Sequence, residues 1–247
     1  MKADILNNNK NEGEELIHRN IAIMSLLLVL VIIGTVIVFE VTEQNNNVKF
    51  IPPVKDFDYF RNQGGEMFIK GNYQQAEELY LEAYLMNPND LETLQSLGVI
   101  TFSQKKWNES IEYFEKFLRQ QQTFDVMFFL ARAYYNEAKY NKGLSSKIKS
   151  ELLNRAKDRA NEGINSFKDV KKQGLFNLIL AALYLETEDS ALCKKHFVYA
   201  SELYQSEFET ILKVKKNWMQ DLLQSTYVID LVKEGKVDID LKQIRSN

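Results

Sequence analysis

The sequence predicts an all-α protein in which an N-terminal transmembrane helix precedes an array of stacked helix pairs. Two observations support this fold class. First, residues that suit close helix packing recur every 34 positions, since Gly64 is followed by Gly98 and Tyr73 by Trp107. A sustained period of this length is typical of a helix–turn–helix array. Second, residues 21–39 carry no charge and consist mainly of Ile, Leu and Val, which is the pattern of a membrane span.

The region before the repeats divides into three segments by composition. Residues 1–20 are polar without a periodic apolar face, which predicts a disordered tail. As a helix, residues 21–39 would span roughly 28 Å, close to the hydrocarbon thickness of about 30 Å. The alternative is a buried core helix, which rarely runs this long without a polar position. No cleavage pattern follows, so we expect an uncleaved anchor. Residues 40–55, with Pro52-Pro53, form the expected linker.

The charges around the apolar segment predict its orientation. Lys2, Lys10 and Arg19 precede it, whereas Lys49 and Lys55 follow it. The small positive excess before the segment favours a cytoplasmic N-terminus. In a bacterium, this predicts a single-pass inner-membrane protein whose repeats lie in the periplasm.

The first helix pair shows why the periodic residues have the types they have. Gly64 and Ala76 are small, as required where two antiparallel helices approach closely. Tyr73 is expected to pack the turn between the helices, and Tyr80 and Ala83 share one face of the second helix. Pro88 closes the unit. One such pair cannot bury its apolar stripe alone, so it requires stacked neighbours.

This segment resembles the tetratricopeptide repeat (TPR) family, in its membrane-anchored bacterial type. The small residue, the turn aromatic, the alanine–aromatic–alanine run and the closing proline stand where the family has them. The resemblance implies a right-handed superhelix of about four TPR helix pairs with a C-terminal capping helix. We expect this domain at residues 56–235, followed by a polar tail at residues 236–247.

Three further repeats follow the first one. Asn89 and Glu92 predict a capping box at the start of the second repeat. In the third, the pattern breaks at residues 141–150. There we expect an insertion, either an exposed loop around Gly143 or extra turns of the second helix that start near residues 145–146. The four repeats are expected at residues 57–90, at residues 91–124, from near residue 124, and at about residues 174–200.

A long amphipathic stretch follows the last repeat. Ser206 and Glu209 fit a capping box at its start, and Gly235 is a natural stop at its end. The last apolar face of a repeat array must be covered. This stretch is therefore the expected capping helix.

The composition and the sequence motifs argue against a catalytic, metal-binding or nucleic-acid-binding function. The net charge is −3 without a basic stripe, which argues against nucleic acid as a partner. Cys193 and His196 share one helix as half of a metal site, but two ligands cannot complete one, and the flanking Lys194 and Lys195 would repel a cation. Motifs of metalloproteases, serine hydrolases, phosphate loops and dinucleotide sites are absent from the sequence. The acidic run Glu77-Glu78 is interpreted as a solvated helix face. We therefore expect no enzyme, no cofactor, no metal and no small-molecule substrate.

The resemblance implies that a peptide or helix of a protein partner binds in a groove lined by the first helix of each repeat. One alternative is that half of the matching side chains simply pack or face water. A TPR subfamily clamps acidic chaperone tails, but of the matching residues Arg61, Gly65, Ser96, Asp125 and Phe129 only Arg61 is compatible. The groove candidates are Arg61, Gly65, Phe68, Gln95, Val99, Phe102, Phe128, Arg132 and Tyr135.

Three of these candidates suggest a hot spot for binding. Phe68, Phe102 and Tyr135 occupy equivalent positions in successive repeats and are expected to form an aromatic ladder beside Arg132. Buried aromatic side chains and arginine dominate interface energies. The alternative is that these rings pack between the repeats.

These features predict a membrane-anchored interaction scaffold or adaptor in a cell-envelope assembly. One alternative is a periplasmic chaperone-like helper at a translocon, and another is a structural subunit of a flagellar-motor collar. A scaffold should be recovered in one stoichiometric complex, whereas a helper should be recovered with many unfolded clients.

Overall fold

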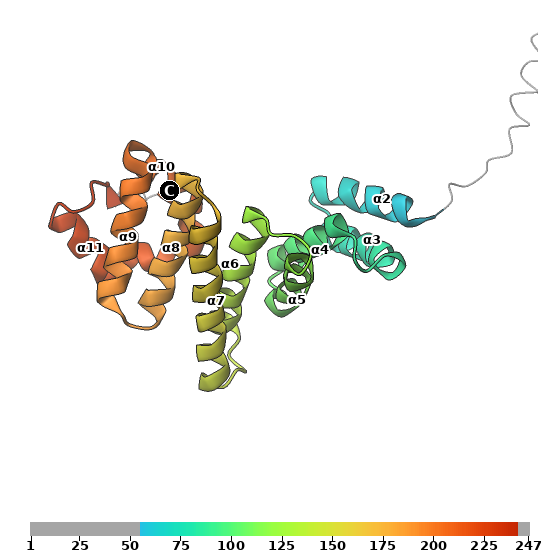
Figure 1. Ribbon diagram of the computed structural model, residues 1–247, viewed down its shortest axis with the longest axis horizontal. Helices are drawn as coiled ribbons and strands as arrows, with labels where there is room; N and C mark the ends of the chain where they lie inside the picture. The colour runs from blue at the N-terminus through green and yellow to red at the C-terminus, as the bar shows by residue number, and fades with distance from the viewer. Residues whose placement is uncertain (1–54, 242–247) are drawn as a thin grey trace, which may run out of the picture. The chain divides into compact units, whose positions relative to one another are not determined.

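The computed structural model describes residues 55–241, apart from the side chains of Ser206 and of residues 214–218. Every element in this part of the chain is a helix, and Figure 1 shows the helices in chain order from blue α2 to the red end. Their bounds are α2 (Phe57–Ile69), α3 (Tyr73–Met86), α4 (Leu91–Ser103), α5 (Trp107–Leu118), α6 (Phe124–Tyr140), α7 (Ser146–Ser166), α8 (Val170–Glu186), α9 (Ser190–Tyr204), the 3₁₀ turn η1 (Gln205–Glu207), α10 (Phe208–Gln224) and α11 (Thr226–Lys233).

The helices pack as successive pairs. The most extensive contacts join α2 to α3, α4 to α5, α6 to α7 and α8 to α9, and each pair contacts the next. These are the four helix pairs expected from the sequence, so the prediction of an all-α helical repeat is confirmed. The first helices α2, α4, α6 and α8 also contact one another in series, whereas the second helices form no comparable contacts within residues 55–241. The surface formed by α2, α4, α6 and α8, here called the first-helix face, is therefore the inner side of the array.

A repeated turn reverses the chain within three of the pairs. Gly71 follows α2 with a φ of +76°, and Lys105 and Glu188 follow α4 and α8 with φ of +64° and +57°. After α2, the amide of Gly71 donates to the Phe68 carbonyl, and the next amide donates to the Met67 carbonyl. The same two bonds recur after α4 and α8. This is the Schellman arrangement, in which a left-handed residue satisfies the last carbonyls of a helix.

The periodic glycines lie where the two helices of a pair meet. A Cβ atom on Gly98 would lie 2.4 Å from the Phe114 ring, and one on Gly64 would lie 2.9 Å from the Tyr80 ring. Both rings are buried. Ala76 is also fully buried, as the close approach requires. The prediction that small residues mark the helix–helix contact is confirmed.

Asp90, rather than Asn89, caps the start of the second repeat. Its carboxylate accepts a hydrogen bond from the Thr93 amide at 2.8 Å, directly before α4. The predicted capping box of Asn89 and Glu92 is therefore wrong by one residue, because the carboxylate satisfies the exposed amides at this helix start.

The insertion in the third repeat lengthens its second helix. The α7 helix has 21 residues, compared with 14 in α3 and 12 in α5. Ser145 caps it by accepting a hydrogen bond from the Ile148 amide. Of the two alternatives, extra helical turns starting at residues 145–146 are confirmed, and Gly143 lies in the short connection before them.

The C-terminal stretch forms two helices instead of one. It breaks at Ser225, whose side chain caps α11 by accepting from the Val228 amide. The helix does not start after Ser206 as expected, because Ser206 lies within η1 and the residue before α10 is Glu207. Gly235 ends α11 with a φ of +65°, as predicted. Val237 and Ile239 are buried in the core, so the described part of the predicted polar tail packs against the domain.

One acidic residue lies in the core rather than in solvent. Glu77 is 6% exposed. Its carboxylate lies 2.7 Å from the ammonium of Lys106, which belongs to the connection between α4 and α5 in the next repeat. The interpretation of Glu77-Glu78 as a solvated face therefore holds for the exposed Glu78 but is wrong for Glu77. Burial of a carboxylate in this position is tolerated because an opposite charge compensates it.

The described helices do not support the membrane prediction. None within residues 55–241 is both long and apolar enough to cross a bilayer, since α8 has only 17 residues and the 21 residues of α7 include many charges. The predicted span, residues 21–39, lies outside the described residues, as do residues 1–20. For the part of the chain that the structure describes, the fold class is therefore corrected to an all-α helical repeat without a transmembrane helix. The predicted inner-membrane localisation, with periplasmic repeats, depended on that helix and is corrected with it.

Candidate protein-binding groove

The predicted groove residues all lie on first helices. Arg61, Gly65 and Phe68 belong to α2, Gln95, Val99 and Phe102 to α4, and Phe128, Arg132 and Tyr135 to α6. Most are half-buried, but Phe128 and Tyr135 are each only 5% exposed. The first-helix face is thus accessible along α2 and α4 and largely covered along α6.

Arg61 joins the first two repeats at this face. Its guanidinium lies 3.1 Å from the Asp58 carboxylate on α2 and 3.6 Å from Glu92 on α4. It also lies 5.2 Å from the centre of the Phe57 ring. The side chains of Asp58 and Glu92 remain 68% and 61% exposed. Arg61 therefore holds the two first helices together and leaves an acidic edge in solvent.

Arg132 lies within a group of aromatic rings. Its guanidinium carbon is 4.9 Å from the centre of the Phe102 ring, 5.5 Å from Phe128 and 5.7 Å from Phe129. Burial lowers the pKa of Arg132 to about 10, because a low-dielectric environment disfavours the charged form. The side chain remains a cation at neutral pH, and the faces of the rings compensate it in part.

The three rings of the expected aromatic ladder do not stack on one another. Phe102 makes an edge contact with Phe129, with centroids 5.3 Å apart, and Phe68 lies 5.6 Å from Tyr73. Among the described side chains, no ring pair joins Phe102 to Phe68 or to Tyr135. The alternative, in which aromatic side chains pack between repeats, describes Phe102 and Tyr135 better.

The α10 helix of the chain itself lies at the C-terminal part of the first-helix face, where that face is covered. The Lys139 ammonium on α6 is 2.5 Å from the Asp221 carboxylate on α10, contacts Glu186 on α8 and donates to the Tyr135 hydroxyl at 2.8 Å. Burial raises the pKa of Tyr135 well above its ordinary value. The sequence predicted that this amphipathic stretch caps the array, and α10 does contact α8 and α9 of the last pair, as α11 contacts α9. The pairing of α10 with Lys139 on α6 was not predicted.

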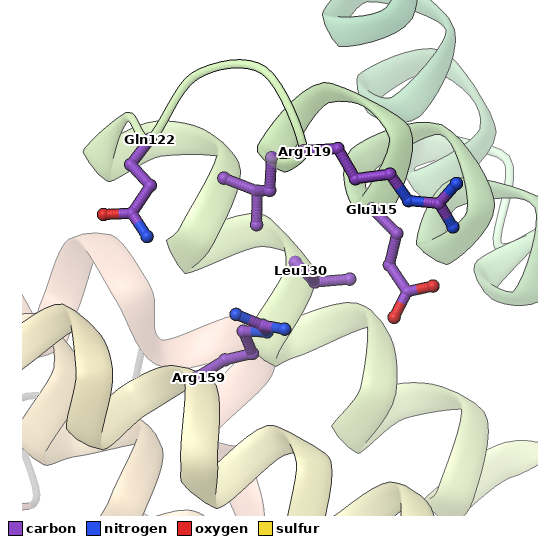
Figure 2. A pocket seen from close by; sticks show the side chains of 6 residues that line it. Glu115, Arg119, Gln122, Leu130 and Arg159 are labelled. Atoms are coloured by element: carbon purple, nitrogen blue, oxygen red, sulfur yellow. The ribbon is translucent and has the colours of Figure 1, made fainter.

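A separate pocket of about 210 Å³ lies among α5, α6 and α7, away from the first-helix face. Figure 2 shows Arg159 reaching from α7 toward Leu130, with Gln122 on one side and Glu115 and Arg119 on the other. Its polar groups are largely engaged. Glu115 accepts from Tyr134, and Gln122 and Arg159 both donate to Glu162. The pocket therefore acts mainly as a polar seam between repeats two and three.

Cys193 and His196 do not form half of a metal site. Burial raises the pKa of the Cys193 thiol to about 11, so the thiol stays protonated. Nδ1 of His196 lies 2.8 Å from the Asn177 side-chain oxygen, and the ring stacks on Tyr184 at 5.4 Å. Among residues 55–241, no group of three or more His, Cys, Asp or Glu side chains is arranged to hold a metal ion.

The fold is similar to that of solved TPR proteins. TTC0263, a thermophilic TPR protein in Thermus thermophilus, superposes with a TM-score of 0.51 at 16% identity, over 77% of this chain and 98% of its own. YrrB, described as a TPR protein with an unusual peptide-binding site, gives a TM-score of 0.46 at 15% identity, over 79% of this chain and 89% of its own. No family model and no curated protein matches the sequence. The likeness to TTC0263 shows that the chain has the TPR fold.

Proposed function

We propose that the chain is a protein-interaction module that binds a peptide or helix of a partner on its first-helix face. The observation that carries the proposal is the accessible part of this face on α2 and α4. There Phe68, Val99 and Phe102 offer apolar surface beside Gln95 and Arg61, and all five are half-buried rather than sealed in the core. Apolar grooves with a few polar groups at their edges are typical of sites for partner helices and peptides.

The charges along this part of the face suggest what the partner carries. Arg61 is already paired with Asp58 and Glu92, and both carboxylates keep more than half of their side-chain surface in solvent. A partner segment with apolar anchors and a basic residue at its edge would complement this surface. Charge complementarity at such an edge contributes mainly to specificity and to the association rate.

A pair of substitutions in the second repeat tests the proposal. Gln95→Lys adds a positive charge to the first-helix face, and Asn108→Lys adds the same charge to the exposed side of α5. Tagged full-length chains would be purified from their native cells, and the bound protein would be quantified. We expect one partner in a fixed ratio with the wild type and with Asn108→Lys, and at least a tenfold loss with Gln95→Lys.

Two outcomes would contradict the proposal. In the first, Gln95→Lys recovers the same partner in the same ratio as Asn108→Lys, so that the bound surface lies elsewhere. In the second, all three chains recover many unrelated unfolded proteins, as expected of a chaperone-like helper. Helical content measured by circular dichroism should be the same for all three chains, since both substituted positions lie on helix surfaces.

A further inference from the structure

The α10 helix covers the first-helix face at the third and fourth repeats. It contacts α8 and α9, and Asp221 reaches Lys139 on α6. Both Tyr135 and Glu186, which complete the contacts of Lys139, belong to first helices. The same face that is accessible on α2 and α4 is thus occupied on α6 and α8 by a segment of the chain itself.

Lys139 acts as the receptor for a carboxylate from α10. Its side chain is only 14% exposed, whereas that of Asp221 is 58% exposed. Burial alone would lower the pKa of Lys139, but hydrogen bonds to Asp221, Glu186 and Tyr135 raise it above its ordinary value. The ammonium therefore stays charged. Because Asp221 reaches Lys139 from the solvent side, another carboxylate has access to the same position once α10 moves away.

The α10 helix has the features of a groove-binding helix. Leu212, Met219, Leu222 and Leu223 are at most 3% exposed, and the last three follow the spacing of three to four residues that places anchors on one helix face. Asp221 lies beside these anchors and supplies the charge that meets Lys139. Apolar anchors at this spacing are the usual means by which a partner helix binds a groove.

The joint before α10 is strained. Gln205, the residue directly after α9, has φ +48° and ψ −124°, a backbone region that residues other than glycine rarely adopt. Gln205 is also the first residue of the 3₁₀ turn η1, which leads directly into α10. This conformation is the one that Gln205 adopts with α10 packed against α8 and α9.

We propose that α10 is a displaceable internal ligand, and that the surface beneath it binds an amphipathic partner helix whose carboxylate replaces Asp221 at Lys139. This proposal rests on the proposed function, because it adds a second, regulated segment to the same first-helix face. A partner must compete with the tethered α10, so its apparent affinity equals its intrinsic affinity multiplied by the fraction of chains in which α10 is released.

A labelled synthetic peptide with the sequence of residues 208–224 tests this proposal on the full-length chain. Binding would be measured by fluorescence anisotropy with the wild type and with Asp221→Lys, in which the chain's own α10 is repelled from Lys139. We expect the peptide to bind Asp221→Lys at least ten times more tightly than the wild type. Gln205→Gly removes the strain at the joint, so it should weaken peptide binding relative to the wild type.

A second peptide that carries Lys at position 221 is the matched control. It should bind the Asp221→Lys chain at least ten times more weakly than the first peptide. If Asp221→Lys loses helical content, the milder Asp221→Asn chain replaces it, with an expected gain of about threefold. Equal affinity of the first peptide for wild-type and variant chains, or equal affinity of the two peptides, would overturn the proposal. Neither result would bear on the loss of partner binding expected for Gln95→Lys, which tests the accessible face on α2 and α4 separately.

Discussion

Substitution of Gly98 by Ala probes the closest helix–helix contact of the second repeat. The added Cβ would lie 2.4 Å from the Phe114 ring, which is fully buried and has little room to move. Overpacking of this kind costs about 1–3 kcal/mol. Alanine recovers about 1 kcal/mol through its higher helix propensity. Because the contact is very short, we place the cost of overpacking at about 2–3 kcal/mol, which leaves a net loss of about 1–2 kcal/mol.

The same substitution at Gly65 provides the control. Its Cβ would lie 3.4 Å from the Tyr80 hydroxyl, an ordinary contact, so the gain in helix propensity should dominate. We expect Gly65→Ala to stabilise the domain by up to about 1 kcal/mol. Thermal unfolding followed by circular dichroism should show a lower Tm for Gly98→Ala, by about 2–8 °C, and an unchanged or higher Tm for Gly65→Ala.

Two results would refute this reasoning. If Gly98→Ala were as stable as the wild type, the helices of the second repeat could separate without cost, and the close approach would not constrain the sequence. If Gly65→Ala destabilised the chain as much as Gly98→Ala, the effect would come from the helix backbone rather than from contact with Phe114.

Three further substitutions test other parts of the fold. Lys105→Gly should stabilise the domain by about 1 kcal/mol, because it removes a side chain from a residue in the left-handed conformation. Gln104→Gly, at a residue in an ordinary conformation, should destabilise the domain. Both effects would be measured by unfolding in urea. Lys106→Met should cost about 1–3 kcal/mol, since it leaves the buried Glu77 carboxylate without its cation, and an unchanged Tm would argue against this ion pair. Burial, with a contribution from the Lys195 charge, lowers the pKa of His196 below its ordinary value of 6.5. The stability that the neutral ring contributes is therefore complete above pH 6.5, and it is lost as the pH falls through the lower pKa of the folded state. His196→Gln should therefore lose less stability than the wild type between pH 7.5 and pH 5.5, and equal losses would contradict this assignment.

The sequence alone predicted the contacts that recur with the repeat. The small residues Gly64, Gly98 and Ala76 follow from a fixed spacing, because the same local packing problem recurs in each repeat. For the insertion at residues 141–150, the sequence left two alternatives, an exposed loop or extra turns of the second helix. Ser145 supported the second alternative, because serine is a favoured residue directly before a helix. These features depend on residues that lie near one another in the sequence.

Contacts that join distant positions could not be predicted in this way. Glu77 resembles a surface residue until Lys106 of the next repeat is placed beside it. The pairing of Asp221 with Lys139 joins α10 to α6 and has no counterpart in the repeat pattern. A periodic sequence indicates which faces are apolar, but not which segment covers each face. For this reason, the sequence predicted candidate groove residues on the first helices but not the pairing of α10 with Lys139 on α6.

The central claim is that a protein partner binds the accessible first-helix face on α2 and α4. A photo-crosslinking amino acid placed at Gln95 tests it most directly, with Asn108 on α5 as the matched position outside the groove. In native cells, we predict one discrete crosslinked protein from position 95 and none from position 108. The absence of an adduct at position 95, or the same adduct from both positions, would contradict the claim.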